Sequence, residues 1–301
     1  MRPTVAGTPP TWNAGARDTV TIVMDAPIII ATLGWLARDA LVGARGRARV
    51  VASLARSAYV RAGDELIWIG APDSPLHGRA VLGHSAVPTP LEGDVTLDVG
   101  HASVWRPDDT AGDVDRRSVA DSARSMLARL GEVGTPEGFA TLLTGATLRF
   151  PFDGAAPAAR ALALASHGDD LDAATRAATQ LIGLGPGLTP AGDDFIGGVF
   201  FAHATFDHAD AREKWRRAGD RIGTRARQAT HPISAVLLAD LIAGRGHAPL
   251  HELARDLAIG ATLPASLDAA RRLTRIGHSS GWDMLAGFLA ALVPPACWET
   301  I

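Results

Sequence analysis

The sequence predicts an α+β protein in which a β-rich N-terminal domain, barrel- or sandwich-like, precedes an all-α C-terminal domain. Short apolar runs separated by turn residues fill the chain from about residue 47 to residue 105. From residue 119 onwards, apolar residues recur at spacings of three and four. Strands and helices do not alternate strictly, which argues against a Rossmann-type sheet.

The β-rich domain is expected to span residues 1–106 and to begin with an early helix over residues 27–41. Strands spaced this closely, with glycine-containing turns between them, favour an antiparallel arrangement. The expected strands cover residues 48–54, 65–69, 80–82, 95–99 and 102–105.

A polar segment with proline and glycine but no periodicity follows, so residues 107–118 are expected to form a linker. The helical domain then covers residues 119–301 and carries both of the loops described below. Its apolar periodicity predicts helices over residues 119–130, 158–165, 171–182, 195–206, 211–227, 233–243, 250–259, 266–276 and 284–292.

Composition excludes several classes of chemistry. A formal net charge of −3 over 301 residues argues against a general nucleic-acid binder. Lys214 is the only lysine and lies in a strongly polar run, so the chain has no P-loop and no buried lysine for a Schiff base. Cys297 is the only cysteine, which excludes an intrachain disulfide. With no secretory signal and no long apolar run, we expect a cytoplasmic protein without membrane or nucleic-acid partners.

A glycine- and proline-rich loop precedes the helix expected near residue 195. Three glycines and two prolines lie within eight residues, which is incompatible with regular structure. Such a loop presents backbone N–H groups and the positive end of a helix dipole to an anion. The alternative is a capping loop, in which acidic residues in the first turn stabilise the helix. The residues expected to bind a small anion here are Gly185, Gly187, Thr189, Gly192 and Asp193.

A second loop repeats the pattern of the first. Both contain Gly-x-Asp-x-(Ile/Leu)-x-Gly, once over residues 192–198 and once over residues 281–287. We expect the two helices to pack through Gly198 and Gly287, because a glycine inside a helix costs about 1 kcal/mol unless something approaches closely. The two helix N-termini would then meet at one pocket, and the second loop would add Ser279, Ser280 and Gly281 to the anion-binding set.

Three residues are candidates for catalysis. Asp194 and Asp283 would face a shared ligand and orient its amide nitrogens, and His278 is the candidate proton carrier because imidazole titrates near neutral pH. An alternative use of the carboxylates is to hold Mg²⁺ through Asp193, Asp194 and Asp283, since this ion prefers oxygen ligands. No other cofactor is expected.

The first loop, residues 183–195, resembles the hallmark of the AllH-type family, formerly a domain of unknown function, which includes a subunit of bacterial oxamate carbamoyltransferase. Residues 277–287 are similar to that family's second motif. The family usually has serine where this chain has Ala191, so a hydroxyl is not essential there.

The resemblance implies a part in carbamoyl transfer. Oxalurate and phosphate would yield oxamate and carbamoyl phosphate during allantoin degradation, a branch of purine catabolism. The small anionic substrate would be handled together with an FdrA-like subunit and a third subunit. The alternative function is a non-catalytic subunit that binds a small anion and regulates its partners.

Overall fold

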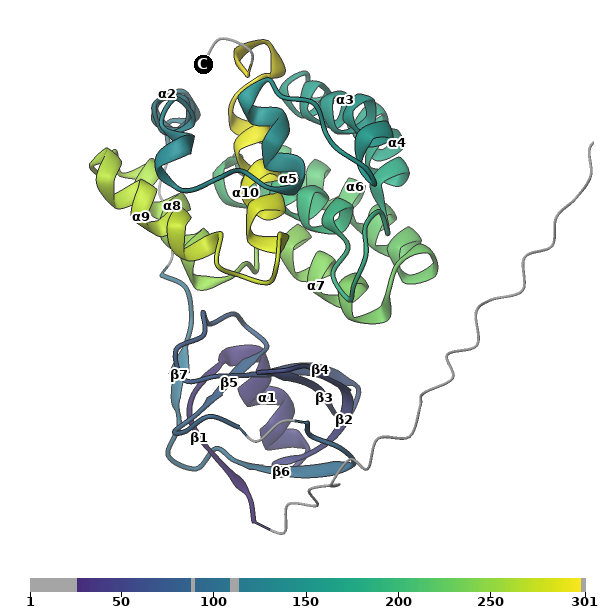
Figure 1. The fold of residues 1–301 in the computed structure, drawn as a ribbon, viewed down its shortest axis with the longest axis vertical. Helices are drawn as coiled ribbons and strands as arrows, with labels where there is room; N and C mark the ends of the chain where they lie inside the picture. Colours follow the sequence, from purple (N-terminus) through teal and green to yellow (C-terminus); the bar gives the residue numbers. More distant parts are fainter. Residues whose placement is uncertain (1–25, 88–89, 109–113, 299–301) are drawn as a thin grey trace, which may run out of the picture.

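The computed structural model describes residues 26–87, 90–108 and 114–298. Its N-terminal part is a barrel with one helix, α1 (Trp35–Gly43), packed against it (Figure 1). Six strands form the barrel, because β1 pairs with β5 and so closes the sheet. In order around the ring they are β5 (Ala80–Gly83), β4 (Glu65–Gly70), β3 (Ala58–Ala62), β2 (Arg47–Ser53), β6 (Asp94–Asp98) and β1 (Ile28–Gly34). The short strand β7 (Ser103–Trp105) extends this sheet beside β1.

The barrel confirms the predicted fold class but corrects three details. The early helix over residues 27–41 is wrong in its first half, where the β-branched run Ile28–Ile30 begins strand β1. Strand β3 has no counterpart among the predicted strands. The pairing is mixed and not purely antiparallel, because β1 runs parallel to β6 and β7, and β4 runs parallel to β5.

The C-terminal part is helical, and each helix expected there is present. The helices are α2 (Arg116–Leu127), α3 (Ala156–His167), α4 (Leu171–Leu181), α5 (Ala191–Phe206), α6 (Ala209–Ala229), α7 (Pro232–Ile242), α8 (Ala248–Ala258), α9 (Leu263–Leu273) and α10 (Ser280–Leu292). Four 3₁₀ segments accompany them among the described residues: η1 (Leu130–Glu132), η2 (Gly138–Thr144), η3 (Asp153–Ala155) and η4 (Pro295–Cys297). None of the helices in this part of the chain is long and apolar enough to cross a membrane.

The predicted linker, residues 107–118, is only partly described by the structure, since residues 109–113 lie outside the described ranges. Helix α2 begins at Arg116, inside the predicted linker, because the Asp115 side chain accepts a hydrogen bond from the backbone N–H of Arg117 at 3.0 Å and caps the helix.

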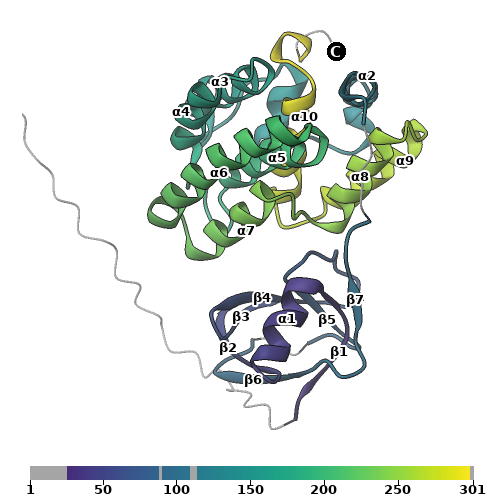
Figure 2. The same ribbon diagram turned by 180° about the vertical axis from the view of Figure 1, so that it is seen from behind.

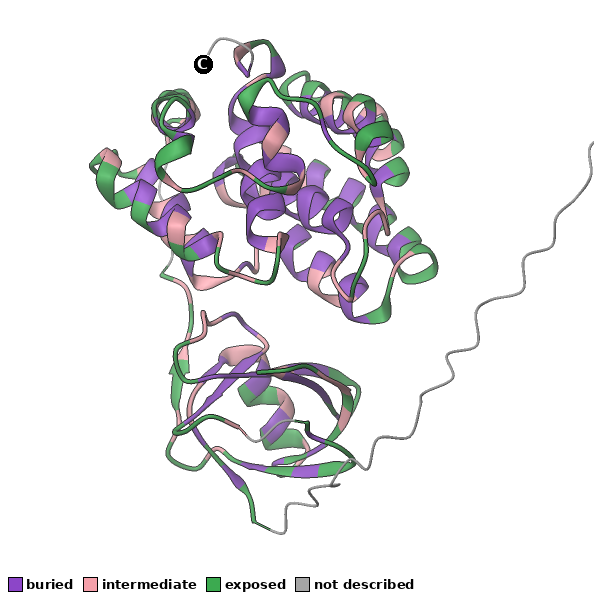
Figure 3. Ribbon diagram, in the orientation of Figure 1, coloured by how far each residue is buried: buried purple, intermediate pink, exposed green. Residues whose placement is uncertain are grey.

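Helices α5 and α10 form the centre of the helical part, and Figure 3 shows that both are buried along nearly their whole length. They cross at two glycines. A Cβ on Gly198 would overlap the carbonyl oxygen of Met284, and a Cβ on Gly287 would overlap that of Phe195. The predicted packing of these helices through Gly198 and Gly287 is therefore confirmed. Their N-termini point toward the barrel (Figures 1 and 2).

The contact region between the barrel and the helices, called the seam below, contains a buried ion pair. Arg79, next to β5, donates through Nε to Asp240 on α7 at 2.5 Å and through Nη1 to Glu65 at 2.5 Å. Arg245 donates to the same Asp240 carboxylate at 2.8 Å. An apolar cluster crosses the seam beside this network, with Tyr59, Leu66 and Ile233 at its centre. The two parts are thus joined by charge pairing and by apolar contact.

Candidate functional site

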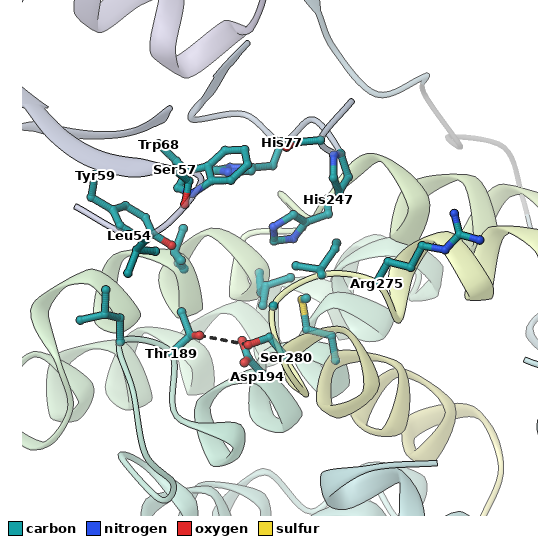
Figure 4. A pocket seen from close by; sticks show the side chains of 18 of the residues that line it. Leu54, Ser57, Tyr59, Trp68, His77, Thr189, Asp194, His247, Arg275 and Ser280 are labelled. Atoms are coloured by element: carbon teal, nitrogen blue, oxygen red, sulfur yellow. Dashed lines mark hydrogen bonds between the residues drawn. The ribbon is translucent and has the colours of Figure 1, made fainter. Parts of the chain in front are cut away.

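A cavity of about 360 Å³ lies between the barrel and the N-terminal ends of α5 and α10. Both parts of the molecule line it, as Figure 4 shows. The helices and their loops supply the floor, which carries Thr189, Asp194 and Ser280. The barrel supplies the roof, which includes Tyr59, Trp68 and His77.

The two Gly–Asp loops meet at this floor, as the sequence predicts. The hydroxyls of Thr189, from the first loop, and Ser280, from the second, are 3.0 Å apart and hydrogen-bonded (Figure 4). The Asp194 side chain lies beside Ser280 and faces the cavity. Residues that are far apart in the chain are therefore brought to one polar site.

Asp194 is a buried acid with an unused oxygen. The residue is 7% exposed, and its Oδ2 atom has no hydrogen-bond partner within the described part of the chain. Burial raises the pKa of Asp194 well above its usual range, and the nearby Asp283 carboxylate raises it further, while a hydrogen bond with Ser280 opposes the shift. The raised pKa favours the protonated form of this carboxyl, which can donate a proton or a hydrogen bond.

Asp283 occupies the equivalent position in the second loop but does not line the cavity. It is fully buried, and its Oδ1 accepts a hydrogen bond from the backbone N–H of Phe139, in η2, at 2.7 Å. Burial raises the pKa of Asp283 to about 7, although hydrogen bonds from Phe139 and Ser279 act in the opposite direction. We expected Asp283 to face the ligand, but its side chain does not line the cavity. Its carboxylate lies near Asp194 and raises the pKa of that residue.

Two of the backbone amides expected to bind an anion, those of Gly192 and Gly281, donate to carbonyl groups of the protein. The N–H of Gly192 donates to the carbonyl of Leu184 at 2.9 Å, and the N–H of Gly281 donates to that of Ile276 at 3.0 Å. A Cβ on either glycine would overlap a carbonyl oxygen at the end of the preceding helix. These two glycines thus allow tight packing of each loop against the end of the preceding helix.

The other glycines of the first loop shape it without lining the cavity. Gly185 has φ of 122°, and a Cβ there would lie 2.9 Å from the backbone nitrogen of Ala191. Gly187 has φ of 95° and is exposed, with nothing near it. Both values lie in the region that favours glycine. These two residues fix the path of the loop toward Thr189.

Asp193 points away from the cavity and holds three segments together. Its Oδ1 accepts from the backbone N–H of Gly183 at 2.9 Å, and its Oδ2 accepts from the hydroxyls of Thr230 at 2.5 Å and Ser234 at 2.6 Å. The residue is 1% exposed. Its carboxylate is therefore satisfied within the protein and secures the loop that precedes α5.

His278 does not reach the floor. Its side chain is 98% exposed and lies 3.7 Å from Glu137, and the residue is not part of the cavity lining. The predicted role of His278 as a proton carrier therefore stays a prediction, at a position outside the cavity. Among the residues that the structure describes, no three His, Cys, Asp or Glu side chains are grouped as a metal site. The Mg²⁺ alternative stays a prediction.

The roof contains functional candidates that sequence reasoning missed. Tyr59, the only tyrosine of the chain, lies in the unpredicted strand β3, and burial together with the Asp194 charge raises the pKa of its hydroxyl. Tyr59 and Asp194 line the same cavity, so the barrel lies close to the helical floor. The uniqueness of this tyrosine is the one signal that could have drawn attention to it.

Two histidines, His77 from the barrel and His247 from the helical part, line the cavity where the two parts meet. The rings of His77 and His247 are 4.7 Å apart, and their backbones form an isolated antiparallel bridge across the seam. Burial lowers the pKa of His77 to about 3, and it also lowers that of His247. The Nδ1 atom of His77 accepts from the backbone N–H of Arg79 at 3.3 Å, so its proton is on Nε2. Both rings are neutral at pH 7.

Comparisons with known proteins bear on the floor of this cavity. Neither the curated proteins nor the solved structures gave a match to the chain. In the comparison with protein families, one part of the chain matches a family model. This part begins at the last residue of α4 and ends at the last residue of α10, so it contains both Gly–Asp loops. Residues 181–292 match the family model described as oxamate carbamoyltransferase subunit AllH, which confirms the resemblance that the two loops suggest.

Proposed function

We propose that this chain is a subunit of a carbamoyltransferase-like complex and that it binds a small ureido acid in the cavity between barrel and helices. One observation carries the proposal. Both loops of the segment that matches the family of an oxamate carbamoyltransferase subunit meet at the cavity floor, which carries a buried acid with a raised pKa and an oxygen that has no partner among the described residues. A ureido group offers the carbonyl oxygen and N–H groups that such an acid and two hydroxyls can bind.

The proposed reaction needs a proton at the leaving nitrogen. With oxalurate as the substrate, a hydrogen phosphate oxygen attacks the terminal ureido carbon, the bond from that carbon to the inner nitrogen breaks, and oxamate leaves. Asp194 gives its proton to that nitrogen and regains one from the hydrogen phosphate, so that protons balance. The hydroxyls of Thr189 and Ser280 hold the ureido carbonyl oxygen. Positioned acids of this kind contribute about 10²- to 10⁴-fold to the rate.

Other subunits form part of the proposal. The family name denotes one subunit of an enzyme, so further subunits are expected, and we infer an FdrA-like subunit and a third subunit as partners. The phosphate would approach from the open side of the cavity, where a partner can add cationic groups. A cytoplasmic location and a place in allantoin degradation accompany this proposal.

The test is phosphate-dependent cleavage of oxalurate by the reconstituted complex, with carbamoyl phosphate as the measured product. Asp194→Asn is expected to lower kcat by about 10²-fold or more, because asparagine cannot supply a proton. The matched control is Asp220→Asn, an exposed aspartate on α6, which should keep full activity.

The regulatory alternative gives a different result. If Asp194→Asn changes ligand binding while kcat stays at the wild-type value, the cavity serves a regulatory function. If neither binding nor kcat changes, the cavity is not the substrate site.

A further inference from the structure

The apolar character of the cavity has no explanation in a substrate as small and polar as oxalurate. Leucine and methionine side chains from both parts of the molecule, together with an indole ring, line the space above the floor: Leu54, Trp68, Leu188, Leu237, Leu241 and Met284. Apolar lining of this kind is typical of sites that bury the hydrocarbon portion of a ligand.

The interior of the cavity also lacks unpaired charge among the described residues. Arg245 lines it, but this guanidinium donates at 3.1 and 2.8 Å to Asp240. His77 and His247 are neutral at pH 7, and burial raises the pKa of Asp194 and so favours its uncharged form. An anion placed among these groups would lose its hydration without gaining a counter-charge, which is costly.

One cation remains available at the rim. Arg275 follows α9, is exposed and forms no ion pair with any residue that the structure describes. Arg275 lines the cavity, and Figure 4 shows its side chain extending outward at one side, away from the floor. A carboxylate can therefore be accommodated at the mouth while the rest of the ligand fills the interior.

We propose that the preferred ligand is a ureido acid with an apolar side chain, chemically an N-carbamoyl derivative of an aliphatic or aromatic amino acid. This inference rests on the proposed function. The carbamoyl group lies on the floor with Asp194, Thr189 and Ser280, the side chain fills the space under Leu54 and Leu237, and the carboxylate faces Arg275. The neutral His247, whose buried Nδ1 has no partner within the described chain, supplies one more polar contact beside the apolar wall.

The test compares two ligands by titration calorimetry on the full-length chain, purified together with the subunits that accompany it. N-carbamoyl-L-leucine is expected to bind about tenfold or more tightly than oxalurate, because burial of a leucine side chain is strongly favourable. Leu54→Ala should remove much of this difference without changing the affinity for oxalurate. Leu54 is 42% exposed, so its truncation leaves the barrel core intact. Leu237→Ala should act in the same way from the helical side.

The control variant is Leu164→Ala, an exposed leucine on α3 away from the cavity, which should leave both affinities unchanged. If oxalurate binds as tightly as N-carbamoyl-L-leucine, or if Leu54→Ala weakens both ligands equally, the apolar preference is overturned while the ureido site stands. If neither ligand binds, the proposed function fails together with this inference.

Discussion

Gly198 on α5 and Gly287 on α10 make reciprocal contacts with the partner helix. When Gly192 is aligned with Gly281, Phe195 aligns with Met284 and Val199 with Phe288. A Cβ on Gly198 would meet the backbone of Met284 and the backbone nitrogen of Phe288 at 2.7 Å, and a Cβ on Gly287 would meet the aligned positions, the backbone of Phe195 and the nitrogen of Val199 at 3.0 Å. The two helices are thus related by an approximate two-fold arrangement, which places both loops at the same end.

Alanine at either glycine should destabilise the protein. Gly198→Ala and Gly287→Ala are each expected to lower the free energy of unfolding by about 1–3 kcal/mol through overpacking, although alanine is the better helix former. Urea denaturation measures the change. Gly223→Ala on α6 is the control, because a Cβ there meets nothing within 4 Å and should raise stability by up to about 1 kcal/mol. Equal effects at all three positions would contradict the proposed close packing.

Substitution of Asp193 should lower the stability of the protein, whereas substitution of the adjacent Asp194 should have little effect on it. Asp193→Asn is expected to cost roughly 2–4 kcal/mol of stability, because the carboxylate accepts three hydrogen bonds from buried donors. Asp194→Asn should leave stability almost unchanged, because burial favours the uncharged form of the native side chain and one of its oxygens is unpartnered among the described residues. Chemical denaturation of both variants at pH 7 is the measurement. A large loss in Asp194→Asn would show that this residue is structural.

Asp283 should make stability fall as pH rises. Its pKa is about 7 in the folded protein against an ordinary value of 3.8, so between these values the folded state holds the proton more tightly than the unfolded state. The stabilisation is complete below pH 3.8 and is lost as pH rises through 7, with a slope of at most about 1.4 kcal/mol per unit. Asp283→Asn keeps an acceptor for Phe139 and removes this slope.

The difference in unfolding free energy between wild type and Asp283→Asn, measured from pH 4 to pH 8, reports this effect together with its coupling to Asp194, and it cancels groups that do not interact with Asp283. Asp220→Asn is again the control, and its difference curve should be flat by comparison. If the difference in unfolding free energy between wild type and Asp283→Asn does not change between pH 4 and pH 7, the raised pKa of Asp283 is disproved.

The buried ion pair at the seam should hold the barrel against the helices. Asp240→Ala leaves Arg79, which is 12% exposed, without a counter-charge across the seam, and a loss of about 3–5 kcal/mol is expected. Hydrogen exchange should increase around the His77–His247 bridge. Asp94→Ala, which breaks an ion pair whose side chains are both 72% exposed, should cost less than about 1 kcal/mol. Unchanged exchange at the bridge in Asp240→Ala would refute this role.

Much of the fold and part of the site follow from the sequence. Most helices of the C-terminal part are predicted because they bury one periodic apolar face, whereas α5 and α10 are buried on all sides. The repeated Gly–Asp pattern correctly predicts that these two cross. Residues 28–34 were misassigned because an apolar run fits a helix as well as a strand, and only pairing with β5 and β6 decides between them.

The electrostatics of the site could not be predicted. Asp193 and Asp194 are adjacent and chemically identical, yet the helix turns one toward Gly183 and Thr230 and the other toward the cavity. The amides of Gly192 and Gly281 are taken by carbonyls of their own loops, which no motif reveals. Tyr59 and His77 reach the site only because the barrel folds over it.

The floor and the roof of the cavity come from different parts of the chain, so substitutions in one part can change the cavity lining while the other part stays the same. The acid and the hydroxyls belong to two helix starts in the C-terminal part, whereas Leu54 and Ser57 belong to the tight turn between β2 and β3, closed by a hydrogen bond of 2.8 Å from the N–H of Leu54 to the carbonyl of Ser57. Under the proposed function, substitutions in this turn are expected to change the accepted side chain without disturbing Asp194, Thr189 or Ser280. The barrel can therefore vary selectivity apart from the helix starts, although Leu188, Leu237, Leu241 and Met284 add apolar lining from the helical part.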